Sequence, residues 1–359
     1  RDGSKGQVMI EIPTHYRKFE TKGTKYIVRL SEYPLSGYHQ VPKMYVSAYE
    51  ASIERSSGKL CSVVNYDVNY RGGNNISSWD NTYRSLLGRP ITYMNIMGFR
   101  SAAQKRNPAN TSWNCYLYQV HKALFWLYVI EYATFNSQLP YTSELTVNGF
   151  HQGGLDLGIS NISNWTEFND FNPLTPCGHT DTIGNRTGIV NYTIYNKDNS
   201  IFKTVNVPRY RGIENIFGHI WKFVDGINTI NTNINGNVIS KVFICEDLSK
   251  FKNTNYNDYK YVGNKVINLD GYIKEIIFGE KGEIIPSLIG NNSSEYFCDY
   301  HYMTKINIGS KDVLQILLLG GSANEYSQIG MLCEFFSNKV SSAGHFGSRL
   351  CFIPEQNKN

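Results

Sequence analysis

Helical periodicity is confined to the first 135 residues of this 359-residue chain. A shorter helix is predicted over Gly98–Arg106, because the Asn107–Pro108 pair that follows disfavours helical backbone. The clearest helix is predicted over residues 114–135, where apolar side chains recur at spacings of three and four. The residues of this apolar face are Leu117, Val120, Leu124, Leu127 and Ile130. Two helices followed by more than 220 residues without helical periodicity exclude an all-α fold and a regular alternation of strands and helices.

Alternating apolar residues predict strands elsewhere in the chain. A β-hairpin is expected from residues 8–12 and 26–30, with its turn at 22–24. Further strand-like segments lie at 43–53, 238–246, 271–278, 313–321 and 347–354. Gly, Asn, Pro and Asp separate these segments into long loops, which are uncommon unless they carry function. The pattern predicts an α+β fold with short antiparallel strands and long loops, organised as a hairpin lead-in over 1–42 and one compact domain over 43–359.

Charge and hydropathy exclude two classes of partner. Thirty-five Lys and Arg against 30 Asp and Glu give a net charge of +5, which is too small to indicate a nucleic-acid surface. No stretch approaches the roughly 20 apolar residues that a membrane-spanning helix needs. The chain begins with Arg1 instead of Met, so we expect a segment to have preceded it.

Catalytic and metal-binding motifs are weak. The seven cysteines are scattered without a Cys-x-x-Cys pair, so most are expected to be buried thiols. Cys177 with His179, and Cys298 with His301, lack the further ligands that zinc requires. Glu131 and Asp225 are interpreted as structural acceptors instead of catalytic carboxylates. We therefore expect no catalytic residue, no metal and no cofactor.

The C-terminal region is the most informative part of the sequence. Between the apolar segments 316–319 and 350–353, large aromatic residues alternate with Ser, Asn and Gln. This mixture is typical of contact surfaces, because Tyr and Phe supply area while small polar side chains adapt their hydrogen bonds. The alternative is that the large residues belong to the core. The candidates are Tyr326, Glu334, Phe335, Phe336, His345 and Phe346.

At this point the sequence resembles the variable proteins of diversity-generating retroelements. The most specific stretches are residues 218–228 (GHIWKFVDGIN) and the ending formed by Gly320–Gly321, GMLCE at 330–334 and GSRLCFIP at 347–354. Further stretches carry the likeness along nearly the whole chain: 7–19, 44–53, 97–107, 124–138, 153–159, 172–188, YRGIENIF at 210–217 and SSEYFCDYHY at 293–302.

The resemblance implies a C-type lectin fold of the subgroup that includes formylglycine-generating enzymes, with a variable region over about 320–347. Gly330, Arg349 and Leu350 would belong to the scaffold. The implied variable, ligand-contacting residues are Ser322, Ala323, Asn324, Glu325, Tyr326, Gln328, Glu334, Phe335, Phe336, Asn338, His345 and Phe346.

The resemblance also implies a function in binding. Family members are phage tail-tip receptor binders or bacterial cell-surface adhesins, and the first is favoured here, which places the protein on the virion tail. The expected partners are a protein or glycan receptor on a bacterial surface, other tail or fibre proteins, and further copies of the chain in a trimer.

Two other functional classes remain open. A formylglycine-generating type of enzyme would need a reactive pair of cysteines, and only Cys333 and Cys351 lie late in the chain, 18 positions apart among apolar residues. A purely structural virion or pilus component would bind only its neighbours in the assembly.

Overall fold

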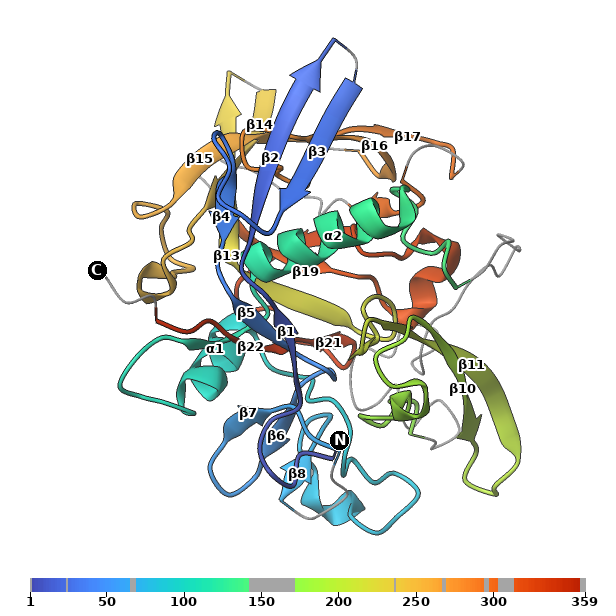
Figure 1. Ribbon diagram of the computed structural model, residues 1–359. Coiled ribbons are helices and arrows are strands. Elements are labelled where there is room, and N and C mark those ends of the chain that lie inside the picture. Colours follow the sequence, from blue (N-terminus) through green and yellow to red (C-terminus); the bar gives the residue numbers. More distant parts are fainter. Residues whose placement is uncertain are drawn as a thin grey trace.

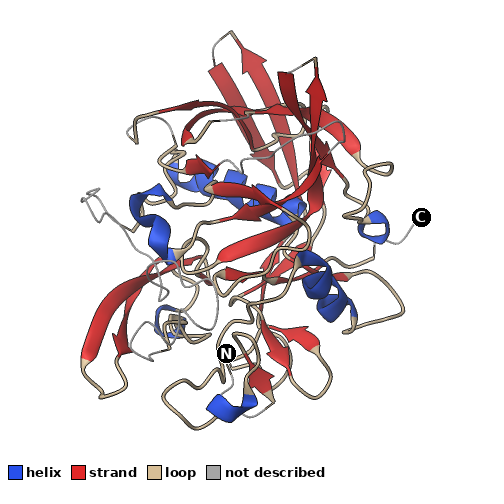
Figure 2. Cartoon of the chain, turned by 180° about the vertical axis from the view of Figure 1, so that it is seen from behind, coloured by secondary structure: helices blue, strands red, loops and turns tan. Residues whose placement is uncertain are grey.

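The computed structural model describes residues 2–23, 25–64, 69–141, 172–235, 237–266, 269–293, 297–302 and 313–355. Strands predominate over helices, and loops connect them on all sides (Figure 2). The two α-helices of the described residues are α1 (Ile96–Gln104) and α2 (Tyr118–Tyr132). This composition confirms the predicted α+β class. The resemblance stretch 153–159 lies outside the described residues.

The largest sheet has nine strands in the order β15-β14-β13-β19-β20-β18-β16-β17, with β21 paired in parallel to β13. Val266 N, just after β15, donates to the carbonyl oxygen of Pro286 in β17 at 3.0 Å, so the sheet curls nearly back onto itself. Its strands are β13 (Trp221–Ile234), β14 (Asn237–Ile244), β15 (Lys260–Lys265), β16 (Gly271–Ile277), β17 (Ile285–Gly290), β18 (Tyr300–Tyr302), β19 (Val313–Leu319), β20 (Glu334–Ser337) and β21 (Phe346–Gly347).

A four-stranded sheet joins the two ends of the chain. Its order is β1-β5-β22-β9, so the last strand lies between two strands from the first third of the sequence. Its strands are β1 (Met9–Ile12), β5 (Met44–Ser47), β9 (Trp113–Cys115) and β22 (Leu350–Phe352). The predicted terminal strand over 347–354 is therefore confirmed and is buried, with Leu350 and Cys351 both 0% exposed.

Three small sheets complete the fold. The order of each is β3-β2-β4, β7-β6-β8 and β10-β11-β12. The strands are β2 (His15–Lys22), β3 (Lys25–Ser31), β4 (His39–Val41), β6 (Ser52–Glu54), β7 (Lys59–Cys61), β8 (Tyr70–Arg71), β10 (Gly188–Tyr195), β11 (Ile201–Tyr210) and β12 (Ile213–Glu214). The β10–β11 hairpin projects from the body of the molecule (Figure 1). Within the described ranges, short 3-10 helices lie in four connections: η1 (Ser77–Trp79), η2 (Asp181–Ile183), η3 (Leu248–Lys250) and η4 (Ala323–Gln328).

The N-terminal hairpin was predicted with the wrong first strand. β3 pairs with β2, whereas β1 pairs with β5 in another sheet. The tight turn joins β2 directly to β3 by pairing Lys22 with Lys25, so the partner of β3 is the strand just before the turn. Pro13 ends β1 before β2 begins, so β1 is a separate strand. The lead-in also shares the main hydrophobic core, because Ile12 and Val41 are both buried in it.

The apolar face predicted for α2 is only partly correct. The helix is buried on nearly all sides, yet Ile130, which was assigned to the apolar face, is 40% exposed. Trp126 contacts both Phe19 of β2 and Phe278 after β16, with ring centroids 5.2 and 5.5 Å away. A helix that packs between two sheets is apolar on both sides, so its sequence does not show the single apolar face that helical periodicity detects. α2 thus lies between the β2–β4 sheet and the large sheet (Figure 1).

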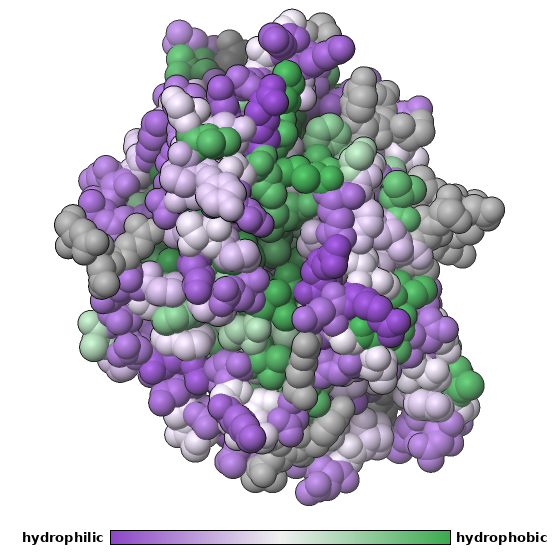
Figure 3. All heavy atoms as spheres, viewed as in Figure 1, coloured by the Kyte–Doolittle hydropathy of each residue, from purple (hydrophilic) through white to green (hydrophobic). Residues whose placement is uncertain are grey.

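Hydrophilic side chains dominate the surface on the side of α2. Figure 3 shows a band of hydrophobic side chains in the middle of this face, where the surface is hollowed, with hydrophilic side chains on both sides. No helix among the residues that the structure describes has the length and apolar character needed to cross a membrane.

Candidate functional site

Three neighbouring strands, β16, β18 and β20, have one buried and one open face. Strand geometry makes consecutive side chains point to opposite faces. In β18, His301 is buried while Tyr300 and Tyr302 on either side are half-buried. Register places Tyr272 of β16 opposite Tyr300, and Phe335 of β20 opposite Tyr302.

These four half-buried side chains, Tyr272, Tyr300, Tyr302 and Phe335, are called the aromatic row below. Ring centroids of Tyr272 and Tyr300 are 5.0 Å apart, and those of Tyr300 and Tyr302 are 4.7 Å apart. Trp221 of β13 lies beneath the end of the row, 5.9 Å from Tyr302 and 6.0 Å from Phe335. Aromatic pairs at 4.5 to 7 Å support one another, so the row is a connected and ordered surface.

The 3-10 helix η4 borders the aromatic row with polar side chains. Glu325 folds back and accepts hydrogen bonds from the backbone N–H and the hydroxyl of Ser322, both at 2.6 Å. Glu325 also accepts from the indole Nε1 of Trp221 at 3.3 Å. Tyr302 Oη donates to Gln328. Burial raises the pKa of Glu325, while its hydrogen bonds to Ser322 oppose that shift. These contacts fix η4 to the row.

The opposite face of the same strands is polar but closed. His301 Nδ1 lies 2.6 Å from Glu334 Oε1, and both side chains are buried. The ammonium group of Lys265 lies 4.2 Å from the ring centroid of Phe336, which is 1% exposed. Burial lowers the pKa of Lys265 to about 8, and Glu334 opposes this shift. Without access to solvent, this face serves stability instead of contact with a partner.

The structure divides the twelve predicted contact residues. Five are buried, which contradicts the expectation of an exposed surface at those positions: Ser322, Ala323, Glu334, Phe336 and Phe346. Five are half-buried: Asn324, Glu325, Gln328, Phe335 and His345. Asn338 is exposed. The side chain of Tyr326 lies outside the described residues.

The buried positions have clear physical reasons. Phe346 belongs to the main core and contacts Phe223 of β13 with ring centroids 5.5 Å apart. Glu334 and Phe336 flank Phe335 in β20, so alternation turns them inward when Phe335 points outward. Ser322 begins η4 and is 0% exposed.

Sequence reasoning missed most of the aromatic row. Tyr272, Tyr300 and Tyr302 lie upstream of the C-terminal region that was singled out. The Tyr-His-Tyr pattern at 300–302 was a usable signal, since residues two apart on a strand share a face. Nothing in the sequence indicated the parallel pairing of β18 with β20, which joins these tyrosines to Phe335.

The residues expected in the scaffold are buried. A Cβ atom on Gly330 would lie 1.8 Å from Oδ1 of Asp299, so only glycine fits there. Arg349 is 0% exposed and donates to the backbone carbonyl oxygens of Glu214 and, at 2.6 Å, Asn215. Gly320 and Gly321 have φ of 96° and 71°, a backbone conformation that glycine adopts without strain.

The cysteines are buried free thiols, as expected. Burial raises the pKa of Cys333 well above its ordinary value and that of Cys351 to about 12. A nucleophilic or redox-active cysteine needs an accessible thiolate. Neither residue provides one in this fold.

The other candidate groups have structural partners. Asp225 is buried and receives two hydrogen bonds from Arg100, at 2.6 and 2.7 Å, as expected for a structural acceptor. Glu131 pairs with Arg211 and accepts from Tyr210. His179 contacts the carbonyl oxygen of Asn191. Across the described ranges, no three His, Cys, Asp or Glu side chains converge on a point that could hold a metal ion.

Comparisons with known proteins give a distant similarity among solved structures. Neither the protein families nor the curated proteins that were searched contain a match. Among solved structures, the chain is similar to one described as "Major Tropism Determinant U1 Variant", with 11% sequence identity and a TM-score of 0.28. The alignment covers 95% of this chain and 72% of that chain.

Proposed function

We propose that this protein binds a receptor through a surface formed by the aromatic row and η4, and that it acts in host attachment at a phage tail tip. The observation that carries the proposal is the row itself, four half-buried aromatic side chains on the open face of a packed sheet. The sequence resemblance to retroelement variable proteins supports the C-type lectin assignment and a bacterial cell-surface receptor.

The chemistry of the row suits recognition. Tyr and Phe provide large contact areas with little loss of side-chain entropy, and the neighbouring rings already hold them in place. Asn324 and Gln328 of η4 add amide groups at the border of the row. Strands position the side chains of the aromatic row more rigidly than a loop would, so these rings need little ordering on binding.

Burial restricts which positions could vary without loss of the fold. Substitution of a buried side chain costs several times more folding energy than substitution at the surface, where changes usually stay within about 0.5 kcal/mol. We therefore propose a reduced variable set of the accessible positions: Asn324, Glu325, Gln328, Phe335, Asn338 and His345.

Binding of the labelled protein to a panel of intact bacterial cells tests the proposal. Phe335→Ala and Tyr300→Ala should each lower cell binding about ten-fold, because each removes an aromatic contact from the row. Tyr195→Ala is the matched control. Tyr195 is a 53% exposed tyrosine on the distant β10, so this variant should bind cells as the parent protein does.

Circular dichroism and melting curves verify that each variant is folded. Equal cell binding by the parent, Phe335→Ala and Tyr300→Ala would refute the proposed surface. For the retroelement assignment, the test is the neighbouring DNA, where a near-copy of the 3′ coding segment differing at adenines should lie beside a reverse transcriptase gene.

A further inference from the structure

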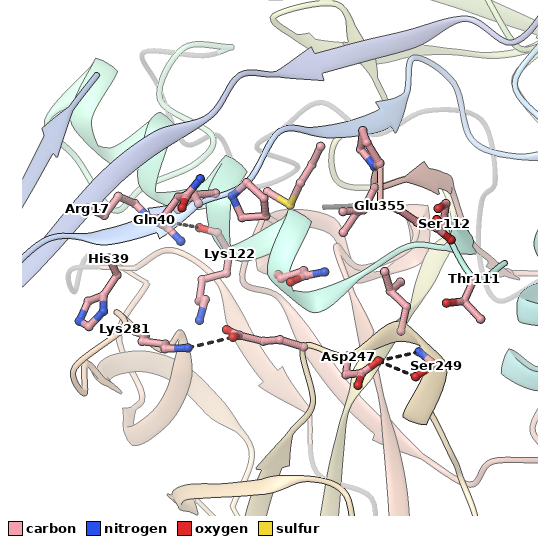
Figure 4. A pocket seen from close by; sticks show the side chains of 18 of the residues that line it. Arg17, His39, Gln40, Thr111, Ser112, Lys122, Asp247, Ser249, Lys281 and Glu355 are labelled. Carbon is pink, nitrogen blue, oxygen red and sulfur yellow. Dashed lines mark hydrogen bonds and ion pairs between the residues drawn. The ribbon is translucent and has the colours of Figure 1, made fainter. Parts of the chain in front are cut away.

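A large pocket lies away from the aromatic row, between elements from four parts of the chain. Its volume is about 1080 Å³. The walls come from β2, β4, α2, η3 and the segment that follows β22. Figure 4 shows Arg17, His39, Lys122 and Lys281 on one side of the view and Thr111, Ser112 and Ser249 on the other. A pocket of this size accommodates a small organic ligand.

Two of the three Lys and Arg side chains in the wall are paired directly with carboxylates. Lys122 Nζ lies 3.1 and 3.2 Å from the two carboxylate oxygens of Glu283, and both residues are buried. Lys281 Nζ lies 2.8 Å from Glu246. These pairs leave neither lysine with an uncompensated charge.

Arg17 is different. Its side chain is 6% exposed, and it forms no ion pair with any residue of the described ranges. One guanidinium nitrogen, Nη1, donates weakly to the carbonyl oxygen of Lys122 at 3.4 Å, and Nε has no hydrogen-bond partner. The ring of Phe19 lies 5.7 Å away. Burial lowers the pKa of Arg17 to about 10, while the carboxylates of Glu283 and Glu246 oppose that shift, so the group is still charged at neutral pH.

Arg17 therefore shares Glu246 and Glu283 with two lysines that pair with them directly. A buried guanidinium group with no ion pair of its own and few hydrogen bonds is costly for folding. A guanidinium group matches the planar, two-oxygen geometry of a carboxylate. Three cations, Arg17, Lys122 and Lys281, share the two carboxylates of Glu246 and Glu283, and this excess of one positive charge suits a single negative charge better than a phosphate dianion.

The wall also holds the carboxylates of Asp247, which pairs with Lys250 at 3.6 Å, and of the exposed Glu355. The wall further contains hydroxyl and amide side chains, from Gln40, Thr111, Ser112, Gln119 and Ser249.

We propose that this pocket binds a small polyhydroxylated carboxylate, with its carboxylate group paired to Arg17 and its hydroxyl groups facing the polar side chains of the wall. The ligand supplies the directly paired carboxylate and the hydrogen-bond acceptors that Arg17 does not find within the described residues. This site is separate from the proposed receptor surface, so either can fail without the other.

Three sugars that differ at one carbon test the ligand class. Glucuronate carries a carboxylate, glucuronamide carries the neutral amide in its place, and glucose 6-phosphate carries a phosphate. Titration followed by NMR of the full-length protein should show glucuronate binding at least about ten-fold tighter than glucuronamide, because the amide cannot pair with a charge. Equal affinities overturn the proposal. Tighter binding of glucose 6-phosphate than of glucuronate overturns the choice of a carboxylate.

Variants of Arg17 test the residue. Arg17→Met should weaken glucuronate binding about ten-fold while the melting temperature stays equal or rises, because an unpaired buried charge is removed. Arg17→Lys keeps the positive charge but not the planar guanidinium group, so its affinity for glucuronate should lie between those of the parent protein and Arg17→Met. Arg29→Met is the control. Arg29 is an exposed arginine on the adjacent β3, so this variant should bind glucuronate as the parent protein does. A lower melting temperature of Arg17→Met, or unchanged binding by it, would refute a ligand-binding role for Arg17.

Discussion

Phe335 and Phe336 are sequence neighbours in β20, yet they lie in opposite environments. Phe335 is half-buried and continues the aromatic row, whereas Phe336 is 1% exposed and packs against Lys265. The same contrast holds in β18 between Tyr302 and His301. The comparison teaches that one short strand can hold a side chain in the core and the next one at the surface, where we propose that it takes part in recognition.

Loss of Phe336 should have the largest effect on stability. Phe336→Ala removes a fully buried aromatic side chain and leaves a cavity, so the free energy of unfolding should fall by about 3–5 kcal/mol. Chemical denaturation measures it. Phe335→Ala is the comparison and should lose clearly less, about 1–2 kcal/mol, because part of the Phe335 side chain is already in contact with solvent. Equal losses would erase the distinction between the two faces.

Asp299 should give the closed face a pH dependence. This carboxyl group precedes β18 and accepts hydrogen bonds from Leu332 N at 2.5 Å and from Ser137 Oγ at 3.3 Å. Burial raises its pKa from 3.8 to about 7, so between these values the folded chain holds a proton that the unfolded chain has released. Stability from this group is therefore complete at the acidic end of the window and falls as pH rises through it.

Denaturation of Asp299→Asn at several pH values isolates this contribution. The free-energy difference between parent and variant should shift in favour of the variant by a few kcal/mol between about pH 4 and pH 7.5. Glu214 has a pKa raised by burial to about 7 in both proteins, so its contribution cancels. A difference that does not change with pH would show that Asp299 is ionised in the folded state.

Tyr302→Phe should have the smallest effect. It removes the phenol hydroxyl that donates to Gln328 but keeps the ring in the aromatic row. The expected loss of stability is about 1 kcal/mol or less, since water replaces part of this bond. Melting curves measure it. A loss as large as that of Phe336→Ala would mean that the row is part of the core.

Local patterns predicted the main elements of the fold. The interruption at Asn107–Pro108 and the periodicity near Leu124 located both helices, and alternation located the strands around residues 240, 274 and 316. The pairing of strands was less predictable. Only the fold shows that β1 joins β5 and that β18 lies beside β20, because these contacts join distant parts of the chain.

The candidate site was predictable only in part. Phe335 was identified from composition, but so was Phe346, which is buried. Both are aromatic residues in a loop-rich segment, and nothing local distinguishes them. Phe346 is buried because β21 pairs with β13 and places its ring in the main core. Phe335 lies on the half-buried face of β20.

The sequence by itself determined the α+β class, the two helices and the alternation that groups Tyr300 with Tyr302 and separates Phe335 from Phe336. Only the tertiary structure decided which of those faces is open, and that Arg17 lines a pocket without an ion pair of its own among the described residues. The physical reason is range. Backbone propensity and periodicity act over a few residues, whereas burial and charge compensation depend on side chains that reach a site from distant parts of the chain.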